Sequence, residues 1–143
     1  MKRTDKKSDC PVNFTLEAVG DAWSLLILRD IVYFGKHTFK EFLSSDERIA
    51  TNILTDRLTK LEMLDILRRE ADPENKRSEK YWLTQKGLDL VPVLLQMMEW
   101  GTKYDSKSTG HRKKEFVARI RKEESPLSRE VKAKVEKGKT AFS

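Results

Sequence analysis

The stretch Thr38–Leu83, TFKEFLSSDERIATNILTDRLTKLEMLDILRREADPENKRSEKYWL, carries the pattern that decides the fold. It opens with three apolar residues at helical spacing, Phe39, Phe42 and Leu43. Turn and cap residues follow over Ser44–Arg48. A longer segment then places four apolar side chains on one helical stripe, namely Ile53, Leu54, Leu58 and Leu61. The pattern predicts a short helix, a turn and a longer helix.

The second part of the stretch predicts a charged hairpin. Its two strands are expected at Ile66–Glu70 and Lys80–Leu83, with the polar loop Asp72–Ser78 between them. A supporting helix, a reading helix sized for the major groove and a two-stranded wing form a winged helix-turn-helix. The sequence therefore predicts a mainly α-helical fold with a small β-wing, and it points to double-stranded DNA as a partner.

Length and composition limit the other classes. A chain of 143 residues is long enough for one domain with a core and a tail. No apolar run reaches membrane-spanning length, and the polar start Met1–Lys7 has no hydrophobic segment behind it. We expect a soluble, cytoplasmic protein with no membrane partner. Cys10 is the single cysteine, and His37 and His111 lie far apart, so neither an internal disulfide nor a metal site nor a cofactor is expected.

The net charge of +6 is unevenly distributed along the chain. Residues 1–110 contain 18 Lys and Arg against 18 Asp and Glu, whereas residues 111–143 contain 11 against 5. Any field that attracts DNA to the first part must therefore come from local arrangement. The candidate patches are Arg68, Arg69, Lys76, Arg77 and Lys80 around the hairpin, and Lys2, Arg3, Lys6 and Lys7 at the start. The hairpin also carries four acidic residues, so a merely solvated surface is the alternative.

The chain is predicted to have three parts. Residues 1–9 form a disordered N-terminal arm, residues 10–104 a winged helix-turn-helix domain with dimerisation helices, and residues 105–143 a basic, partly helical extension. Pro11 suits the first position of a helix that turns Leu16 and Val19 inward and ends near Gly20.

The next helix is predicted to be the central, buried one. It runs from Trp23 to Phe34, is apolar almost all round, and stops at Gly35, which suits a C-terminal cap. Its polar interruptions, Arg29 and Asp30, are expected to mark the face that reaches solvent.

The reading helix supplies the candidate base-contacting residues. Thr51 lies near its start, and Asn52, Thr55, Asp56 and Thr59 fall broadly opposite the apolar stripe. Asn can pair bidentately with adenine, and Thr can meet a thymine methyl or a phosphate. The alternative is that these residues only solubilise the helix, with Ser45 or Asp46 as its cap. Arg57 lies nearer the apolar stripe, which favours an internal salt bridge or a phosphate contact. The hairpin candidates for DNA contact are Lys76, Arg77 and Lys80.

A helix capped by Thr84 is expected to form the dimer interface. Leu88, Val91, Leu95 and Met98 alternate in spacings of three and four, as in paired helices, and Trp100 lies nearby. Leu90, Leu94 and Met97 form a second stripe, so the helix is expected to have two partners: its own domain and the same helix of another copy. Alternatively, both stripes lie in one core. Pro92 either kinks the helix or lies in its first turns. A twofold dimer would match a palindromic operator.

The chain resembles the HxlR family of bacterial and archaeal winged-helix transcription regulators. The resemblance is carried by an ordered set of motifs: Cys10-Pro11-Val12, Leu16, Gly20 and Trp23; Leu25–Arg29; Phe39–Phe42; Ile53–Leu58 with Leu61 and Glu62; Tyr81–Thr84 with Lys86 and Gly87; Val91–Leu94; and Glu99–Gly101. It implies a MarR-like architecture, dimerisation through terminal helices, and repression or activation of nearby genes.

The chain departs from the family pattern at two places. Leu64-Asp65-Ile66 stands where the family usually has Asp-Gly or a similar pair, and Asp can adopt the left-handed conformation at modest cost. The tail beyond Gly101 is longer and more basic than the family requires. It is an extra dimer helix, a contact to the DNA backbone or a disordered extension.

Cys10 is a candidate redox sensor. In some members that the chain resembles, a cysteine at this position, next to proline before the first helix, senses electrophiles or oxidants. A thiol at a helix N-terminus with Lys6 and Lys7 close in sequence favours the reactive thiolate. It could bridge to its counterpart in a dimer or to a small thiol. The alternative is a small packing residue, and the effector is not identified by the sequence.

An enzyme is not expected. The sequence has no Gly-rich phosphate loop, no metal-ligand cluster and no Ser/His/Asp order. A thiol peroxidase based on Cys10 would lack a resolving cysteine in the same chain. The stronger alternative is a winged-helix module for protein–protein contact, because the charge of residues 1–110 is neutral overall.

Overall fold

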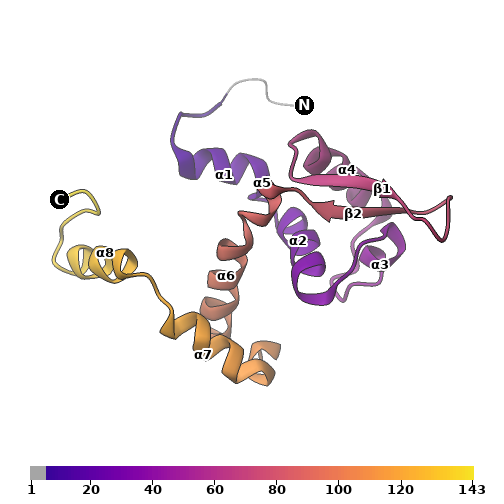
Figure 1. Cartoon of the computed structure of the whole chain (residues 1–143). Coiled ribbons are helices and arrows are strands. Elements are labelled where there is room, and N and C mark those ends of the chain that lie inside the picture. Colours follow the sequence, from indigo (N-terminus) through magenta and orange to yellow (C-terminus); the bar gives the residue numbers. More distant parts are fainter. Residues whose placement is uncertain (1–5) are drawn as a thin grey trace. The chain divides into compact units, whose positions relative to one another are not determined.

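The computed structural model describes residues 6–143. The predictions for residues 1–5, including the patch residues Lys2 and Arg3, lie outside the described residues. The elements in chain order are α1 Pro11–Val19, α2 Ala22–Phe34, α3 Phe39–Leu43, α4 Thr51–Met63, β1 Leu67–Ala71, β2 Glu79–Leu83, α5 Gln85–Leu88, α6 Val91–Tyr104, the 3-10 helix η1 Thr109–Lys113, α7 Lys114–Lys122 and α8 Pro126–Glu136 (Figure 1). The predicted mainly α-helical winged helix-turn-helix with a two-stranded wing is confirmed.

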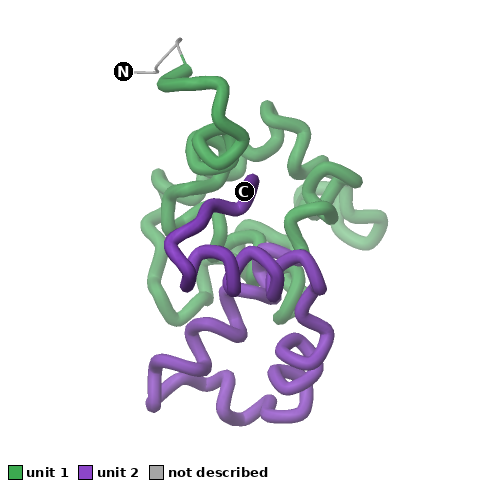
Figure 2. The backbone as a smooth tube through the Cα atoms, turned by 90° about the vertical axis from the view of Figure 1, so that its left-hand side faces the viewer, with its two compact units in different colours: residues 1–91 green, residues 92–143 purple. Residues whose placement is uncertain are grey.

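The chain divides into two compact units, residues 1–91 and residues 92–143 (Figure 2). The second unit contains α6 together with the tail, and the predicted division after residue 104 stays a prediction. Leu94 and Thr102 of α6 are buried, as are Val117 and Ile120 of α7. Glu99 of α6 also accepts a hydrogen bond from Arg121 of α7 at 2.9 Å.

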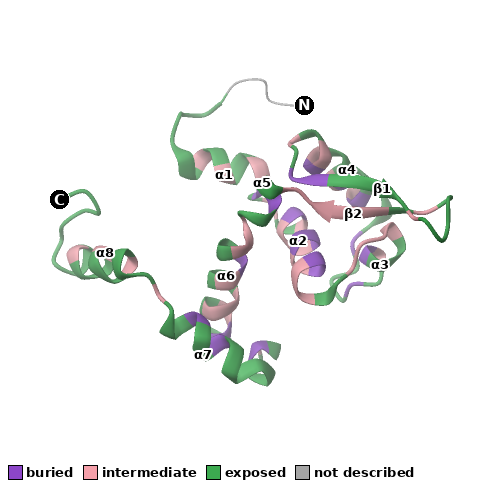
Figure 3. Ribbon diagram, in the orientation of Figure 1, coloured by how far each residue is buried: buried purple, intermediate pink, exposed green. Residues whose placement is uncertain are grey.

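The core of the first unit is built around α2 and α4. Figure 3 shows buried positions along both helices. The buried apolar residues of this unit are Val19, Ile27, Leu28, Ile31, Phe42, Ile49, Leu54, Leu58, Leu61, Ile66 and Leu67. The predicted α4 stripe is thus confirmed at three of its positions, and Ile53 is half-buried. The predicted cap of α2 is also confirmed, since Gly35 has a φ of 63°.

Two expectations about the first helices are wrong. Asp30 does not reach solvent, because it is 2% exposed and lies in a network of hydrogen bonds described below. Leu16 is not turned inward but is 59% exposed. Val19, in the last turn of α1, is the one residue of this helix that is buried, so the inward orientation predicted for Val19 is confirmed.

The helix-turn-helix is closed by local hydrogen bonds. Thr38 caps α3 in a capping box, in which its hydroxyl accepts from Glu41 N and the Glu41 carboxylate accepts from Thr38 N. α4 begins after Ala50, which offers no capping side chain, so neither Ser45 nor Asp46 caps this helix. After α4 the chain turns at Asp65 with a φ of 59°, and the expectation that Asp replaces glycine there is confirmed.

The wing is an antiparallel pair with Leu67 opposite Leu83 at its base and Ala71 opposite Glu79 at its tip. His37, in the segment before α3, is hydrogen-bonded to both the backbone N–H and the backbone carbonyl of Tyr81 in β2. Tyr81 N donates to His37 O at 2.7 Å, and Nδ1 of the same histidine lies 2.8 Å from Tyr81 O. The wing therefore has a fixed connection to the helix-turn-helix.

The helix expected from Thr84 through Met98 is two helices. Thr84 caps α5, as predicted, by accepting from Gly87 N. α5 ends at Leu88, however, and α6 starts at Val91. Pro92 has no N–H to donate to the carbonyl of Leu88, so a continuous helix would lose a hydrogen bond there. Pro92 was expected either to kink a helix or to lie in its first turns. The structure shows the second alternative, because Pro92 is the second residue of α6.

Candidate nucleic-acid interface

The solvent side of α4 carries five polar residues, which we call the reading face: Thr51, Asn52, Thr55, Asp56 and Thr59, all exposed. The helix of 13 residues is about 20 Å long. Its opposite side is anchored in the core by the buried leucines. A long helix held from behind with an exposed polar side has the form needed to enter a major groove.

Two threonines of the reading face donate their hydroxyl protons within the helix. Thr55 Oγ1 donates to Thr51 O at 3.0 Å, and Thr59 Oγ1 donates to Thr55 O at 2.8 Å. These bonds satisfy the hydroxyl donors and leave the γ-methyl groups for outside contacts. The Asn52 amide has no hydrogen-bond partner in the described part of the chain, so both its donor and its acceptor are available.

Arg57 joins α4 to the start of α2. Its Nε donates to Asp21 Oδ2 at 2.9 Å and its Nη1 to Asp56 Oδ2 at 2.5 Å. Asp21 also accepts from the backbone N of Ser24 at 2.9 Å and from its hydroxyl at 2.6 Å. The internal salt bridge expected for Arg57 as one alternative is thus present.

Electrostatics follow from this arrangement. Partial burial opposes ionisation of Asp21, but the hydrogen bonds from Ser24 and Arg57 outweigh it and lower the pKa of Asp21. The hydrogen bond to Asp21 in turn raises the pKa of Arg57. Because this guanidinium is held inside the domain, it fixes the rotation of α4 and has fewer donors left for DNA.

A second network holds the turn between α3 and α4. Asp30 accepts from Arg29 Nε at 3.1 Å, from Arg29 Nη2 at 2.7 Å and from the hydroxyl of Ser45. Arg29 also binds Glu47 at 2.6 and 2.8 Å, and Lys36 Nζ donates to Ser45 Oγ at 3.1 Å. The hydrogen bonds from Arg29 lower the pKa of Glu47 to about 2. Sequence reasoning missed this network because Asp30 looked like a surface residue.

The wing cations divide into paired and unpaired groups. Arg68 binds Glu70 at 2.7 Å, and Arg69 binds Glu62 at 2.6 Å and Glu79 at 3.0 Å. Within the described residues, the side chains of Lys76, Arg77 and Lys80 form no ion pair or hydrogen bond. These three are therefore the wing cations with all their donors available for phosphate oxygens.

Two further cations near the reading face were not among the predicted DNA-contacting residues. Lys40 on α3 and Arg48 in the turn before α4 are exposed, and neither side chain has a partner in the part of the chain that the structure describes. Arg48 has a φ of 55°. In helix-turn-helix proteins the supporting helix crosses the DNA backbone. In the sequence, the signal that could have identified them is the presence of one basic residue in α3 and one in the turn before α4.

Residues 18–109 match the model of the HxlR-like helix-turn-helix family. The chain belongs to this HxlR-like family. It is 35% identical over 101 residues to the HTH-type transcriptional regulator YdeP of Bacillus subtilis, covering 71% of this chain and 78% of YdeP. It is also similar to the reduced form of the redox regulator HypR, with 35% identity, a TM-score of 0.59 and coverage of 66% and 92%. The reduced transcriptional regulator YodB of Bacillus subtilis has 27% identity and a TM-score of 0.53, with coverage of 71% and 99%.

In this HxlR-like protein, Cys10 directly precedes α1. It is exposed, its carbonyl accepts from Phe14 N at 2.9 Å, and its own N–H donates to Ser8 Oγ at 3.3 Å. The exposed thiol is not a core residue of this chain. The neighbouring Lys6 binds Asp9 at 3.8 Å.

The residues predicted to form the dimer interface do not share one helix. Leu88 belongs to α5 and is 48% exposed, whereas Leu95 and Met98 of α6 are half-buried and Val91 starts α6. Trp100 is 66% exposed. The most exposed apolar stripe of α6 consists of Val93, Met97, Trp100 and Tyr104, so Trp100 is the one predicted interface residue that lies on it.

No group of three or more His, Cys, Asp or Glu side chains within residues 6–143 is arranged to hold a metal ion. None of the helices in the same range is long and apolar enough to cross a membrane.

Proposed function

We propose that this HxlR-like protein is a transcriptional regulator that binds a palindromic operator as a homodimer. The observation that carries the proposal is the exposed polar reading face of α4, held in a fixed orientation by Arg57 and by the buried leucines. The two reading helices of a dimer would enter major grooves about one helical turn apart. Lys76, Arg77 and Lys80 of the wing, together with Lys40 and Arg48, would bind phosphates. The similarity to YdeP, HypR and YodB supports this reading.

Dimerisation is supported by uncovered apolar surface. Trp100 and Tyr104, with ring centroids 5.3 Å apart, are both 66% exposed on α6. Exposed aromatic pairs of this kind are common in protein interfaces. The predicted interface residues Leu88, Val91, Leu95 and Met98 remain part of the proposal.

Cys10 is the proposed sensor of electrophiles or oxidants. Its exposure gives a reagent access, and α1, which it precedes, carries uncovered apolar residues that suit a subunit contact. With diamide as oxidant, two thiols lose two protons and two electrons and form one S–S bond, while diamide is reduced to its hydrazine form. The second thiol is Cys10 of the other protomer or a small thiol.

DNA binding is tested by mobility shift on the DNA upstream of the protein's own gene, across a range of salt concentrations. Wild type should prefer this DNA over a random duplex. Arg77→Gln should weaken binding to all sequences alike and reduce the salt slope by about 1 per protomer. Arg68→Gln is the matched control, because Glu70 already pairs with Arg68. Equal binding of wild type to upstream and random DNA would refute the proposed function.

The sensor is tested separately with Cys10→Ser. This variant should bind the operator like wild type and lose the response to diamide. If diamide-treated wild type and treated Cys10→Ser bind equally well, the signal enters elsewhere.

A winged-helix module for protein–protein contact is the alternative function. The observation that favours it is the balance of 18 basic and 18 acidic residues over residues 1–110. In that case binding to duplex DNA would be weak and would not depend on sequence.

A further inference from the structure

We propose that the reading face of α4 selects A·T base pairs at the centre of each half-site. The inference rests on the proposed DNA binding and names the bases that this face can read. At about 100° per residue, Asn52, Thr55 and Thr59 fall within roughly 60° of one another. All three are exposed. At the same angular step Thr51 and Asp56 fall on either side of them, so these three side chains form the middle of the face. The bases that these three side chains fit decide the core of the half-site.

Guanine lacks its usual partner on this helix. The commonest specific contact to guanine is a bidentate bond from Arg or Lys to O6 and N7. α4 contains two such residues, and both are engaged: Arg57 binds Asp21 at 2.9 Å, and Lys60 Nζ donates to Glu17 O at 3.0 Å. Neither lies in the middle of the reading face.

Cytosine also lacks its best acceptor. A carboxylate can accept from the N4 amino group of cytosine. Asp56 is the acidic residue of the reading face, but its Oδ2 already accepts from Arg57 Nη1 at 2.5 Å. Turning Oδ2 to a base would break that ion pair, and the negative charge that Oδ1 shares is already partnered by the Arg57 guanidinium. Thus neither base of a G·C pair meets an uncommitted charged group on the face.

The groups that are available match adenine and thymine. The Asn52 amide has no partner within residues 6–143 and can pair bidentately with N6 and N7 of adenine. The hydroxyl protons of Thr55 and Thr59 are donated to carbonyls of the helix itself. Their methyl groups can therefore contact thymine C5-methyl groups without leaving a hydroxyl donor unsatisfied.

The first experiment is in vitro selection of duplexes from a randomised pool with the full-length protein. A·T pairs should be enriched in the core of both half-sites. In the selected operator, exchange of the core adenine that Asn52 reads should weaken wild type by roughly 5- to 150-fold. Asn52→Ala should show much less discrimination at that position.

A matched pair of variants isolates the methyl contact. Thr55→Val keeps a γ-methyl and loses the hydroxyl, whereas Thr55→Ser keeps the hydroxyl and loses the methyl. Replacing only the core thymine that Thr55 contacts by deoxyuridine removes that C5-methyl from the DNA and leaves the thymine that Thr59 contacts in place. This replacement should weaken wild type and Thr55→Val by about 5-fold. It should leave Thr55→Ser nearly unchanged.

The outcomes separate this inference from the proposed function. Enrichment of a G·C-rich core would overturn the inference and leave sequence-specific DNA binding intact. Indifference of wild type to deoxyuridine would also overturn it. A pool with no enriched sequence would instead refute the proposed function itself.

A second inference rests on different residues: we infer that cations of the tail bind the phosphate backbone of DNA next to the operator. Residues 111–143 hold 11 basic against 5 acidic residues. Several tail cations are already paired, as in Arg121 with Glu99, Lys132 with Glu124 and Lys134 with Glu130. The exposed tail cations that have no side-chain partner in the described part are Arg112, Lys113, Lys114, Lys122, Lys137 and Lys139.

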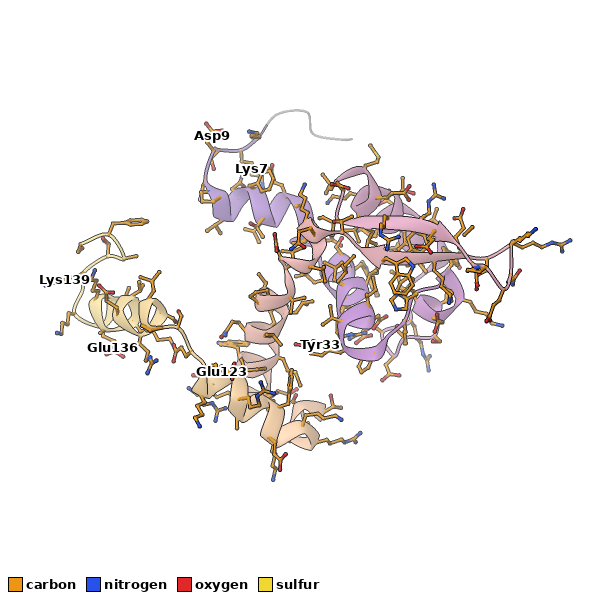
Figure 4. All side chains as sticks on the ribbon, viewed as in Figure 1. Lys7, Asp9, Tyr33, Glu123, Glu136 and Lys139 are labelled. Carbon is orange, nitrogen blue, oxygen red and sulfur yellow. The ribbon has the colours of Figure 1, made fainter. Side chains whose placement is uncertain are left out.

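Three of these cations are consecutive. Arg112, Lys113 and Lys114 lie where η1 meets α7, beginning three residues after the end of the family match at residue 109. Figure 4 shows the side chains of the tail projecting outward around α7 and α8, among them the labelled Glu123, Glu136 and Lys139. Polyanionic DNA has the complementary charge. This inference rests on the proposed function, in which the tail is covalently joined to a DNA-binding unit, so that its effective concentration near phosphate is raised.

The test compares the salt dependence of binding. Changing Arg112, Lys113 and Lys114 together to Gln should make the slope of log affinity against log salt shallower by about 2.7 per protomer. Operator and random duplex should be affected alike, so the ratio of the two affinities stays unchanged. Lys132→Gln with Lys134→Gln is the control for two cations that are already paired. An unchanged slope in the triple variant, or an equal change in the control, would overturn the inference.

Discussion

Removal of the Asp30 carboxylate is expected to destabilise the first unit strongly. In Asp30→Ala, Arg29 loses hydrogen bonds of 3.1 and 2.7 Å, and the hydroxyl of Ser45 loses its acceptor. The carboxylate is buried, at 2% residue exposure, so water cannot replace it without opening the structure. The turn that precedes the reading helix would lose its attachment to α2.

The expected loss in the free energy of unfolding depends on the contacts that Arg29 keeps in Asp30→Ala. Breaking a buried ion pair by removing one partner costs about 3–5 kcal/mol. Arg29 still has Glu47, and its side chain is 22% exposed, so the lower limit applies and we expect about 3 kcal/mol. With a urea m-value of about 1–3 kcal/mol/M, the midpoint should fall by roughly 1–3 M.

Urea unfolding followed by circular dichroism measures this loss. Asp46→Ala is the matched control, because Asp46 is exposed near the same turn and its side chain has no partner within residues 6–143. This control should change the free energy of unfolding by no more than about 0.5 kcal/mol. A loss of less than about 1 kcal/mol in Asp30→Ala would refute the assigned role of the network.

Three further predictions concern the wing base, the turn and assembly. Gly87→Ala should lower the free energy of unfolding by about 2 kcal/mol, because a Cβ would lie 2.3 Å from a backbone oxygen, whereas Gly101→Ala, with open space around it, should not destabilise. The ion pair of Glu47 with Arg29 should contribute about 1 kcal/mol after screening of a carboxylate that is 37% exposed. Because the folded pKa of Glu47 is lowered to about 2, this stability is present above about pH 4.5 and is lost as the pH falls toward 2, which acid titration of wild type and Glu47→Gln would measure. Trp100→Ala should shift a homodimer toward monomer in light scattering, and an unchanged mass would exclude this side chain from the interface.

Local patterns predicted the elements of the first unit well. The apolar stripe of α4 and the strands of the wing depend on residues a few positions apart, which a sequence displays directly. The left-handed Asp65 was expected from the resemblance instead, because the family usually has Asp-Gly or a similar pair there and Asp adopts this conformation at modest cost.

Long-range partners were the part that the sequence did not reveal. Asp30 looked solvent-facing because its acceptor role depends on Ser45, 15 residues away. The partner of Arg57 is Asp21, 36 residues away, so an internal salt bridge and a phosphate contact could not be distinguished beforehand. The apolar spacing also continued across the break between α5 and α6, because hydrophobic periodicity does not register the missing N–H of Pro92.

The division of labour on α4 has a consequence for divergence between related regulators. The orientation of α4 is fixed by the Arg57–Asp21 ion pair and by the buried leucines. Backbone carbonyls of the helix accept the hydroxyl protons of Thr55 and Thr59. The side chains of Asn52, Thr55 and Thr59 hold no other element in place. On the proposed reading of bases by these three positions, a duplicated copy of the gene exchanges them and acquires a different target sequence while its thermal stability stays nearly constant. New regulatory connections would then be accessible by single substitutions, with no intermediate that fails to fold.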